Sequence, residues 1–178
     1  MKNSNILEWL RDNSAVTAVE FAFIAPVMIV IAFGVIVLSN AFDCYSKVQA
    51  MAATAADITS QNDEFSDTDR DNVFAASKSV LYPYGQSNAV IILSSIVDDG
   101  KGSTKVEWSD ATDGNPIPYK TAVTLPSGVI APGGSVIMAN VSYTYTPPAI
   151  SDIVGTLTFQ ETVYAVPRAS AQVARVRG

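Results

Sequence analysis

The segment SAVTAVEFAFIAPVMIVIAFGVIVL, residues 14–38, decides the fold of this chain because it is long and almost wholly apolar. Residues 21–38 carry no charge, and the next four residues extend the uncharged run to Asp43. A helix of this length crosses a hydrocarbon core of about 30 Å. A buried core helix is the alternative. The run is apolar on every face, which favours a membrane span.

The charges that flank this segment predict its orientation. Lys2 and Arg11 precede the span, whereas only Lys47 follows it closely. This bias favours a cytoplasmic N-terminus, which places the rest of the chain outside the cytoplasm. A cleaved secretory signal is the competing interpretation. Signal cores are short and end at a cleavage site, whereas this one continues into an alanine-rich helical stretch, so we expect a retained anchor.

Glu20 is the one carboxylate in the segment. A carboxylate costs about 2.5–3.5 kcal/mol at the centre of a bilayer and less near the interface. Glu20 either reaches the headgroup water or needs a cationic partner. A short polar leader ends in the small residue Ala15, and Glu20 is the fifth residue after it. This spacing resembles the processing site of type IV prepilins, in which cleavage leaves a glutamate at the fifth position of the mature chain.

The stretch AVEFAFIAPVMIVIAFGVI, residues 18–36, resembles the TadE-like pseudopilins of the tight-adherence (Tad, or Flp) pilus system. It has the AVEFA core of that family, a proline six residues after the glutamate (Pro26) and a Phe-Gly pair that ends at Gly34. Weaker similarity continues in VEWSDATDG (106–114), VSYTYTPP (141–148) and VYAVPRAS (163–170). The family usually has glycine before the cleaved bond, where this chain has Ala15.

The resemblance implies a non-enzymatic pseudopilin or minor pilin that a prepilin peptidase cleaves between Ala15 and Val16. The implied partners are that peptidase, other Tad pilins and pseudopilins, the pilus assembly platform and inner-membrane lipid. Cleavage would create an ammonium group on Val16, four residues or about 6 Å along a helix from Glu20. Each charge would reduce the desolvation cost of the other, within one subunit or between neighbours. Pro26 permits a helix kink, and Gly34 permits close helix approach.

The sequence predicts an α+β fold with three parts: a prepilin-type leader (1–15), a transmembrane and stalk helix (16–62) and a periplasmic domain (63–178). On the stalk, Val48, Met51, Ala52, Ala55 and Ile58 recur at spacings of three and four and predict a buried face. Ser66 and Asp69 predict a capping box for a second helix that runs to about Leu81.

After Tyr82 the composition becomes strand-like, which predicts a pilin-like domain with an antiparallel β-meander. The five expected strands are residues 89–97, 104–108, 120–125, 135–145 and 156–166. The C-terminal segment PRASAQVARVRG is expected to be a flexible tail. The alternative is that its arginines dock on the acidic 57–71 region of a neighbouring subunit.

Composition excludes several other functions. The net charge is −6 and no basic patch is present, so a nucleic-acid partner is not expected. Histidine is absent and no nucleophile or nucleotide motif occurs, so we expect neither an enzyme nor a cofactor. The DTDRD spacing is similar to the start of a calcium loop, but Asn72 and Lys78 replace its glycine and glutamate, so no metal is expected. The alternative function is an uncleaved single-span protein whose periplasmic β-rich domain binds a partner; a membrane-anchored hydrolase is a more distant third.

Overall fold

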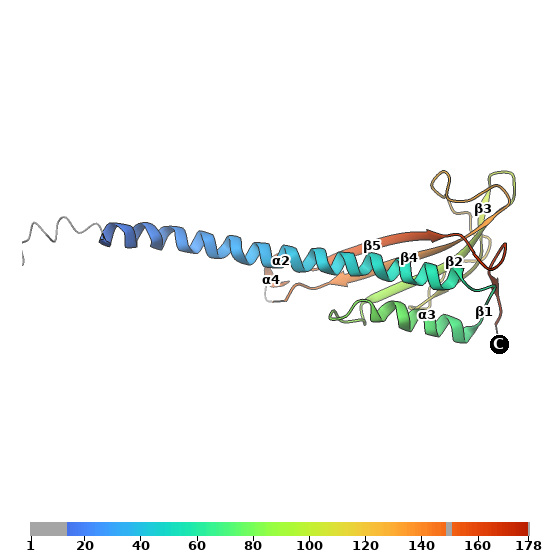
Figure 1. Cartoon of the computed structure of the whole chain (residues 1–178), viewed down its shortest axis with the longest axis horizontal. Coiled ribbons are helices and arrows are strands. Elements are labelled where there is room, and N and C mark those ends of the chain that lie inside the picture. The colour runs from blue at the N-terminus through green and yellow to red at the C-terminus, as the bar shows by residue number, and fades with distance from the viewer. Residues whose placement is uncertain (1–13, 149–150, 178) are drawn as a thin grey trace, which may run out of the picture. The chain divides into compact units, whose positions relative to one another are not determined.

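The computed structural model describes residues 14–148 and 151–177, and these divide between Asn40 and Ala41 into two compact units. The first unit contains the N-terminal part of helix α2 (Ser14–Ser60), which continues through Pro26. The second unit contains the rest of α2 and all the other elements (Figure 1). The expected helix over 16–62 therefore forms, and it ends two residues earlier than expected.

The second unit is built on a four-stranded antiparallel sheet of β2 (Ala89–Asp98), β3 (Thr104–Ala111), β4 (Ser135–Tyr145) and β5 (Leu157–Ala165). The strand order is β3-β2-β4-β5, so β4 returns past β3 to pair with β2. The α+β class and the antiparallel sheet are confirmed. The expectation of sequential neighbours is wrong at this one connection.

The third of the five predicted strands, residues 120–125, does not form. This segment makes one isolated bridge, between Ala122 and Lys105 of β3. Lys120 has a φ of 61°, which is in the left-handed region and interrupts an extended backbone. Pro118 and Pro126 flank the segment and offer no N–H to a ladder. The segment therefore follows the edge of β3 without becoming a strand.

Helix α3 (Asp67–Ser79) begins at the predicted cap. The Ser66 hydroxyl accepts a hydrogen bond from the Asp69 N–H at 3.2 Å, and an Asp69 carboxylate oxygen accepts one from the Ser66 N–H at 2.9 Å. The pKa of Asp69 is lowered, first by the side-chain and then by the backbone hydrogen bond of Ser66, because both favour the charged form. Val73, Phe74 and the following Leu81 are buried, whereas Val80 is only partly buried.

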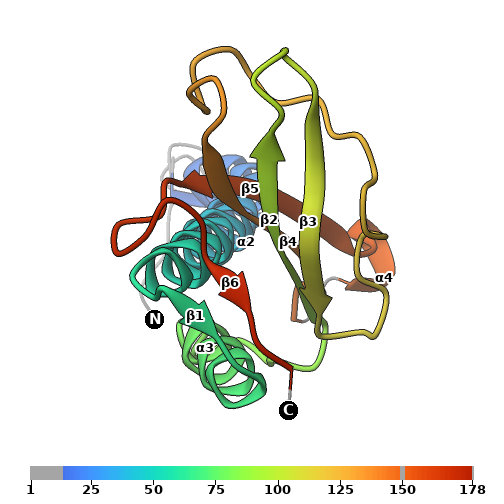
Figure 2. The ribbon, with the colours of Figure 1, turned by 90° about the vertical axis from the view of Figure 1, so that its right-hand side faces the viewer.

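The main core lies between α2, α3 and one face of the sheet (Figure 2). The predicted stripe on α2 is buried at four of its five positions, and Ile58 packs against the core while partly exposed. A second, smaller core on the opposite face is covered by apolar residues of the 112–134 connection. Its buried members are Ile96, Val106, Val136 and Met138.

Two short strands and a short helix were not predicted. Strand β1 (Glu64–Phe65) pairs in parallel with β6 (Ala174–Arg175), as Figure 2 shows. Helix α4 (Ser151–Val154) lies in the connection between β4 and β5. The β1–β6 pair fixes the C-terminal segment to the start of α3, so the expectation of a flexible C-terminal tail is wrong.

Candidate assembly site

The N-terminal part of α2 presents apolar side chains that no other described part of the chain covers. Between Val16 and Asn40 every residue is exposed except Ala25 and Val37, which are half-buried. Phe23 is 76% exposed and Val30 is 71% exposed. This is the one helix among the described residues that is long and apolar enough to cross a membrane. Such a surface requires lipid or neighbouring helices to cover it.

Glu20 lies near the start of this helix and is exposed. Val16, which would become the mature N-terminus, lies four residues earlier and is 57% exposed. Ala15 is within α2, but the structure does not describe its side chain. Residues 1–13 of the expected leader lie outside the described residues. One helical turn thus separates the Val16 backbone nitrogen from Glu20, which is the spacing that the predicted ion pair needs.

Pro26 and Gly34 both lie within α2. A Cβ atom added at Gly34 would meet no atom within 4 Å in this chain. The chain's own packing therefore gives no reason for glycine there. The roles expected of both residues, kinking and close helix approach, concern contacts with other molecules and stay predictions.

The remainder of α2 is an integral part of the second unit. Cys44, Val48 and Met51 are fully buried in its core. Two hydrogen bonds between side chains add to this packing. Tyr84 donates to Asp43 at 2.9 Å, and Tyr45 donates to Glu161 of β5 at 3.2 Å. Burial, followed by the hydrogen bond and charge of Asp43, raises the pKa of Tyr84, so this hydroxyl remains a donor at any physiological pH.

Arg175 forms the main polar cluster of the second unit. Its side chain is 5% exposed, and its guanidinium lies between two carboxylates. Nε donates to Asp110 at 2.6 Å, one terminal nitrogen donates to Asp67 at 2.5 Å, and the other donates to the Phe65 carbonyl at 3.0 Å. Burial lowers the pKa of Arg175, but the hydrogen bonds with Asp110 and Asp67 outweigh it and raise that pKa. The cluster joins β6, β3 and the first turn of α3.

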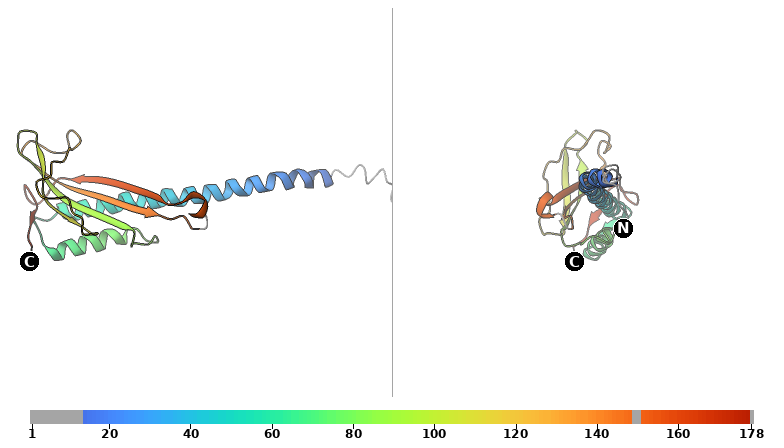
Figure 3. Two further views of the ribbon diagram at one scale, coloured as in Figure 1. Left: turned by 180° about the vertical axis from the view of Figure 1, so that it is seen from behind. Right: turned by 90° about the vertical axis from the view of Figure 1, so that its left-hand side faces the viewer.

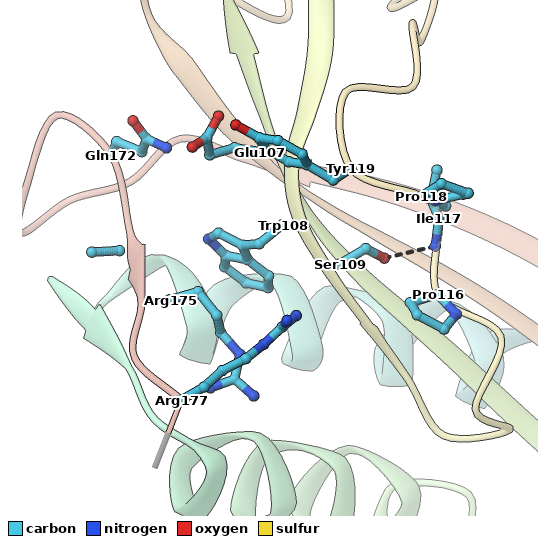
Figure 4. Close-up of a pocket in the computed structure, with 11 residues that line it drawn as sticks. Glu107, Trp108, Ser109, Pro116, Ile117, Pro118, Tyr119, Gln172, Arg175 and Arg177 are labelled. Carbon is cyan, nitrogen blue, oxygen red and sulfur yellow. Dashed lines mark hydrogen bonds between the residues drawn. The ribbon is translucent and has the colours of Figure 1, made fainter.

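Aromatic contacts continue this cluster. The Arg175 guanidinium lies 5.6 Å from the centre of the Phe65 ring, and that ring stacks on Trp108 with centroids 5.2 Å apart. The Trp108 indole N–H donates to the Val173 carbonyl at 2.8 Å. Beside Trp108 is an open pocket of about 630 Å³, shown in Figure 4. Arg177 and Tyr119 also line it.

Arg168 provides a second link between the C-terminal segment and the stalk. Its guanidinium lies 2.5 Å from an Asp57 oxygen of α2, and its backbone N–H donates to the Ser60 carbonyl at 2.8 Å. The arginines thus bind the predicted acidic region, but within their own chain. Sequence reasoning missed Asp110 entirely, and the only signal for it was its position in the VEWSDATDG segment.

Asp98 and Asp99, two adjacent carboxylates at the end of β2, hold loops together. One Asp98 oxygen accepts from the N–H groups of Gly100 at 3.2 Å and Gly133 at 2.8 Å. Asp99 accepts from the N–H groups of Lys101 and Ser103, and these bonds lower the pKa of Asp99. Both carboxylates therefore have the backbone role that acidic residues commonly have in turns.

Comparison with protein families finds a match between residues 15–57 and the family of TadE-like proteins. A search of curated proteins and a search of solved structures each returned no match. The matched segment begins at Ala15 and ends beside the Asp57–Arg168 ion pair, so it covers the exposed helix and most of the buried stalk. The family is a structural one associated with the Tad pilus. Over residues 15–57, this chain is thus similar to the TadE-like proteins.

Proposed function

We propose that this protein is a minor pilin of the Tad (Flp) pilus that a prepilin peptidase cleaves between Ala15 and Val16. The observation that carries the proposal is the exposed apolar helix with a single carboxylate at its start, in the segment that matches the TadE-like family. A chain that spans a membrane once has no need of a charge there. A chain that must gain a cationic partner after cleavage does.

The electrostatics of the mature helix support Glu20 as the assembly determinant. Cleavage makes Val16 the first residue, so Glu20 then lies in the first turns of a helix. A carboxylate is stabilised there by the helix dipole, by about 0.3–1 kcal/mol. The new ammonium group adds a full positive charge about 6 Å along the axis. In lipid, the ammonium group of a neighbouring subunit can form the same pair with Glu20. This pairing offsets the desolvation cost of both charges, and it therefore favours subunit addition.

The proposed location is the bacterial inner membrane, with a cytoplasmic N-terminus and the second unit in the periplasm before incorporation into the pilus. Lys2 and Arg11 before the span support this orientation. The proposed partners are the prepilin peptidase, other Tad pilins and pseudopilins, the assembly platform and inner-membrane lipid. The structural nature of the matched family supports a role without catalysis.

The alternative is an uncleaved single-span protein whose periplasmic domain binds a partner. Ala15 favours this alternative, because the family usually has glycine at that position. Intact-mass measurement of the protein from cells with an active prepilin peptidase separates the two. Loss of residues 1–15 supports the minor pilin, whereas a full-length mass supports the uncleaved anchor.

Two substitutions at Ala15 sharpen this test. Ala15→Gly restores the usual residue of the family and is expected to increase the cleaved fraction. Ala15→Lys places a long charged side chain before the bond and is expected to leave the chain intact. If neither substitution changes the mass distribution, processing does not occur at this bond.

Assembly is tested separately at Glu20. Glu20→Ala and Glu20→Gln both remove the charge, and both are expected to leave membrane insertion intact while the protein disappears from sheared pili. Glu20→Asp keeps the charge and serves as the matched control. Normal recovery of the Glu20→Gln variant in sheared filaments would refute the ion-pair mechanism.

A further inference from the structure

The two edges of the sheet differ in whether another segment of the chain hydrogen-bonds to them. The edge of β3 is followed by residues 117–123, which donate to or accept from the backbone of Thr104 and Val106 and the side chain of Ser109. The opposite edge strand, β5, makes no backbone hydrogen bond to any described segment other than β4. Figure 3 shows β5 as the outer border of the sheet.

Apart from one charged residue, Glu161, strand β5 also lacks the features that usually protect an exposed edge. It pairs with β4 over nine consecutive residues, without a bulge. Its sequence, LTFQETVYA, contains no proline and no lysine. Natural edge strands are usually short, bulged or interrupted by such residues, because an open row of backbone groups is a template for another strand. A long and regular open edge therefore indicates a docking site for an extended segment.

A groove lies beside this edge. It has a volume of about 780 Å³ and lies between β5 with its following residues and one side of α2. Its α2 wall is made of the small residues Ala53, Thr54 and Ala56 together with Asp57, which is paired with Arg168 at one end of the groove. Val166, at the end of β5, also lines the groove and is 62% exposed. A strand added to β5 would thus have room for apolar side chains over the small residues of α2.

The charge on β5 indicates which charge the added strand should carry. Glu161 is the one charged residue of β5 and lies at its midpoint. A β5 strand of a second copy, paired antiparallel about this midpoint, would place Glu161 opposite Glu161, and like charges directly opposite destabilise a pair. That pairing would also make the two α2 helices antiparallel, because β5 and residues 41–60 of α2 run in the same direction (Figure 1).

We propose that the open edge of β5 binds an extended segment of a different Tad pilus subunit. This segment adds a fifth strand to the sheet, places small or β-branched side chains in the groove and presents a lysine or arginine opposite Glu161. The proposal rests on the proposed function only for the source of the strand. The regular backbone of β5 supplies affinity, and Glu161 supplies selectivity against a second β5 strand and for a basic residue.

Site-specific photo-crosslinking of the full-length protein in piliated cells tests this proposal. A photo-reactive phenylalanine analogue replaces Gln160, an exposed residue of β5, and in the control it replaces Lys105, an exposed residue of β3 beside its covered edge. We expect Gln160 to crosslink to another pilus subunit and Lys105 not to do so. Crosslinks of similar yield at both positions, or at neither, would overturn the proposal.

The charge is tested in the Gln160 background. Glu161→Lys changes an attractive pair into a repulsive one and is expected to lower the crosslink yield about tenfold. Tyr45→Phe removes the hydrogen bond to Glu161 without changing the charge and is expected to keep the yield, so it controls for local packing. An unchanged yield with Glu161→Lys would refute the basic partner residue.

The outcomes separate this inference from the proposed function. A chain that is recovered in sheared pili but does not crosslink through Gln160 retains the function and refutes the β5 partner. A chain that crosslinks to a pilus subunit yet stays uncleaved in the membrane retains the β5 partner and refutes the minor-pilin function. Absence of both crosslink and incorporation refutes both.

Discussion

Arg175→Met is expected to destabilise the second unit strongly while leaving the membrane helix unaffected. Methionine fills much of the same space but leaves the Asp110 side chain, which is 11% exposed, without its partner. Removal of one member of a buried ion pair costs about 3–5 kcal/mol. Asp67 is 42% exposed, so its share of the loss is below about 1 kcal/mol. The corresponding decrease in Tm for a unit of this size is roughly 10–20 °C.

Tryptophan fluorescence measures this loss in the full-length protein. Trp108 is 6% exposed and stacks on Phe65, so its emission follows the unfolding of the cluster. Trp9→Phe, in the background of all variants, removes the other tryptophan of the chain. The control is Arg177→Met, which removes an exposed guanidinium two residues away. Its Tm is expected to stay within about 2 °C of the parent, because surface charges contribute little.

A second substitution tests the electrostatic cause. Asp110→Leu, added to Arg175→Met, removes the unpartnered buried carboxylate and is expected to recover part of the lost stability, since apolar replacements of a whole buried pair are often neutral. Equal decreases in Tm for Arg175→Met and Arg177→Met would refute the reasoning. The reasoning would also be refuted if the double variant lost as much stability as Arg175→Met and Asp110→Leu lose together when measured singly.

Three further predictions concern the elements that support the site. Because the pKa of Asp69 is lowered from 3.8, its stabilisation is present at neutral pH and is lost as the pH falls through the lowered value. Asp69→Asn should therefore reduce the free energy of unfolding at pH 7 by about 1 kcal/mol, and this effect should become smaller as the pH is lowered below 3.8. Met51→Ala should cost about 2–5 kcal/mol in chemical denaturation because Met51 is fully buried, whereas Phe42→Ala, at a side chain 62% exposed, should cost less than about 0.5 kcal/mol. Trp108→Phe leaves the Val173 carbonyl without its donor and should lower stability by about 1–3 kcal/mol and increase hydrogen exchange in the β6 segment; unchanged exchange there would contradict the role of this bond.

Local patterns were sufficient to predict helices α2 and α3. The Ser66–Asp69 box predicted the start of α3 because a capping box is made by residues three apart, with no contribution from the rest of the fold. The spacing of Val48, Met51 and Ala55 predicted the buried face of α2 for a similar reason. The four strands of the main sheet were also predicted, but the segment expected to be a fifth strand does not form, because Lys120 adopts a positive φ that its residue type does not require.

The order of the strands and the polar cluster depended on contacts between residues far apart in the sequence. No local signal indicates that β4 pairs with β2 rather than with the segment just before it. Asp110 and Arg175 are separated by 65 residues, and each alone has the sequence context of a surface residue. The C-terminal segment was expected to be mobile for the same reason, since its few apolar residues could not predict that Val173 would be fully buried.

The sequence by itself determined that this chain has an exposed apolar helix with Glu20 one turn from a candidate processing site, because helix length and spacing are local properties of the chain. Only the tertiary structure decided that the C-terminal arginines bind their own chain's carboxylates and that the edge of β5 is left open. Those outcomes depend on which distant segments meet, and that is set by the packing of the sheet against α2 and α3.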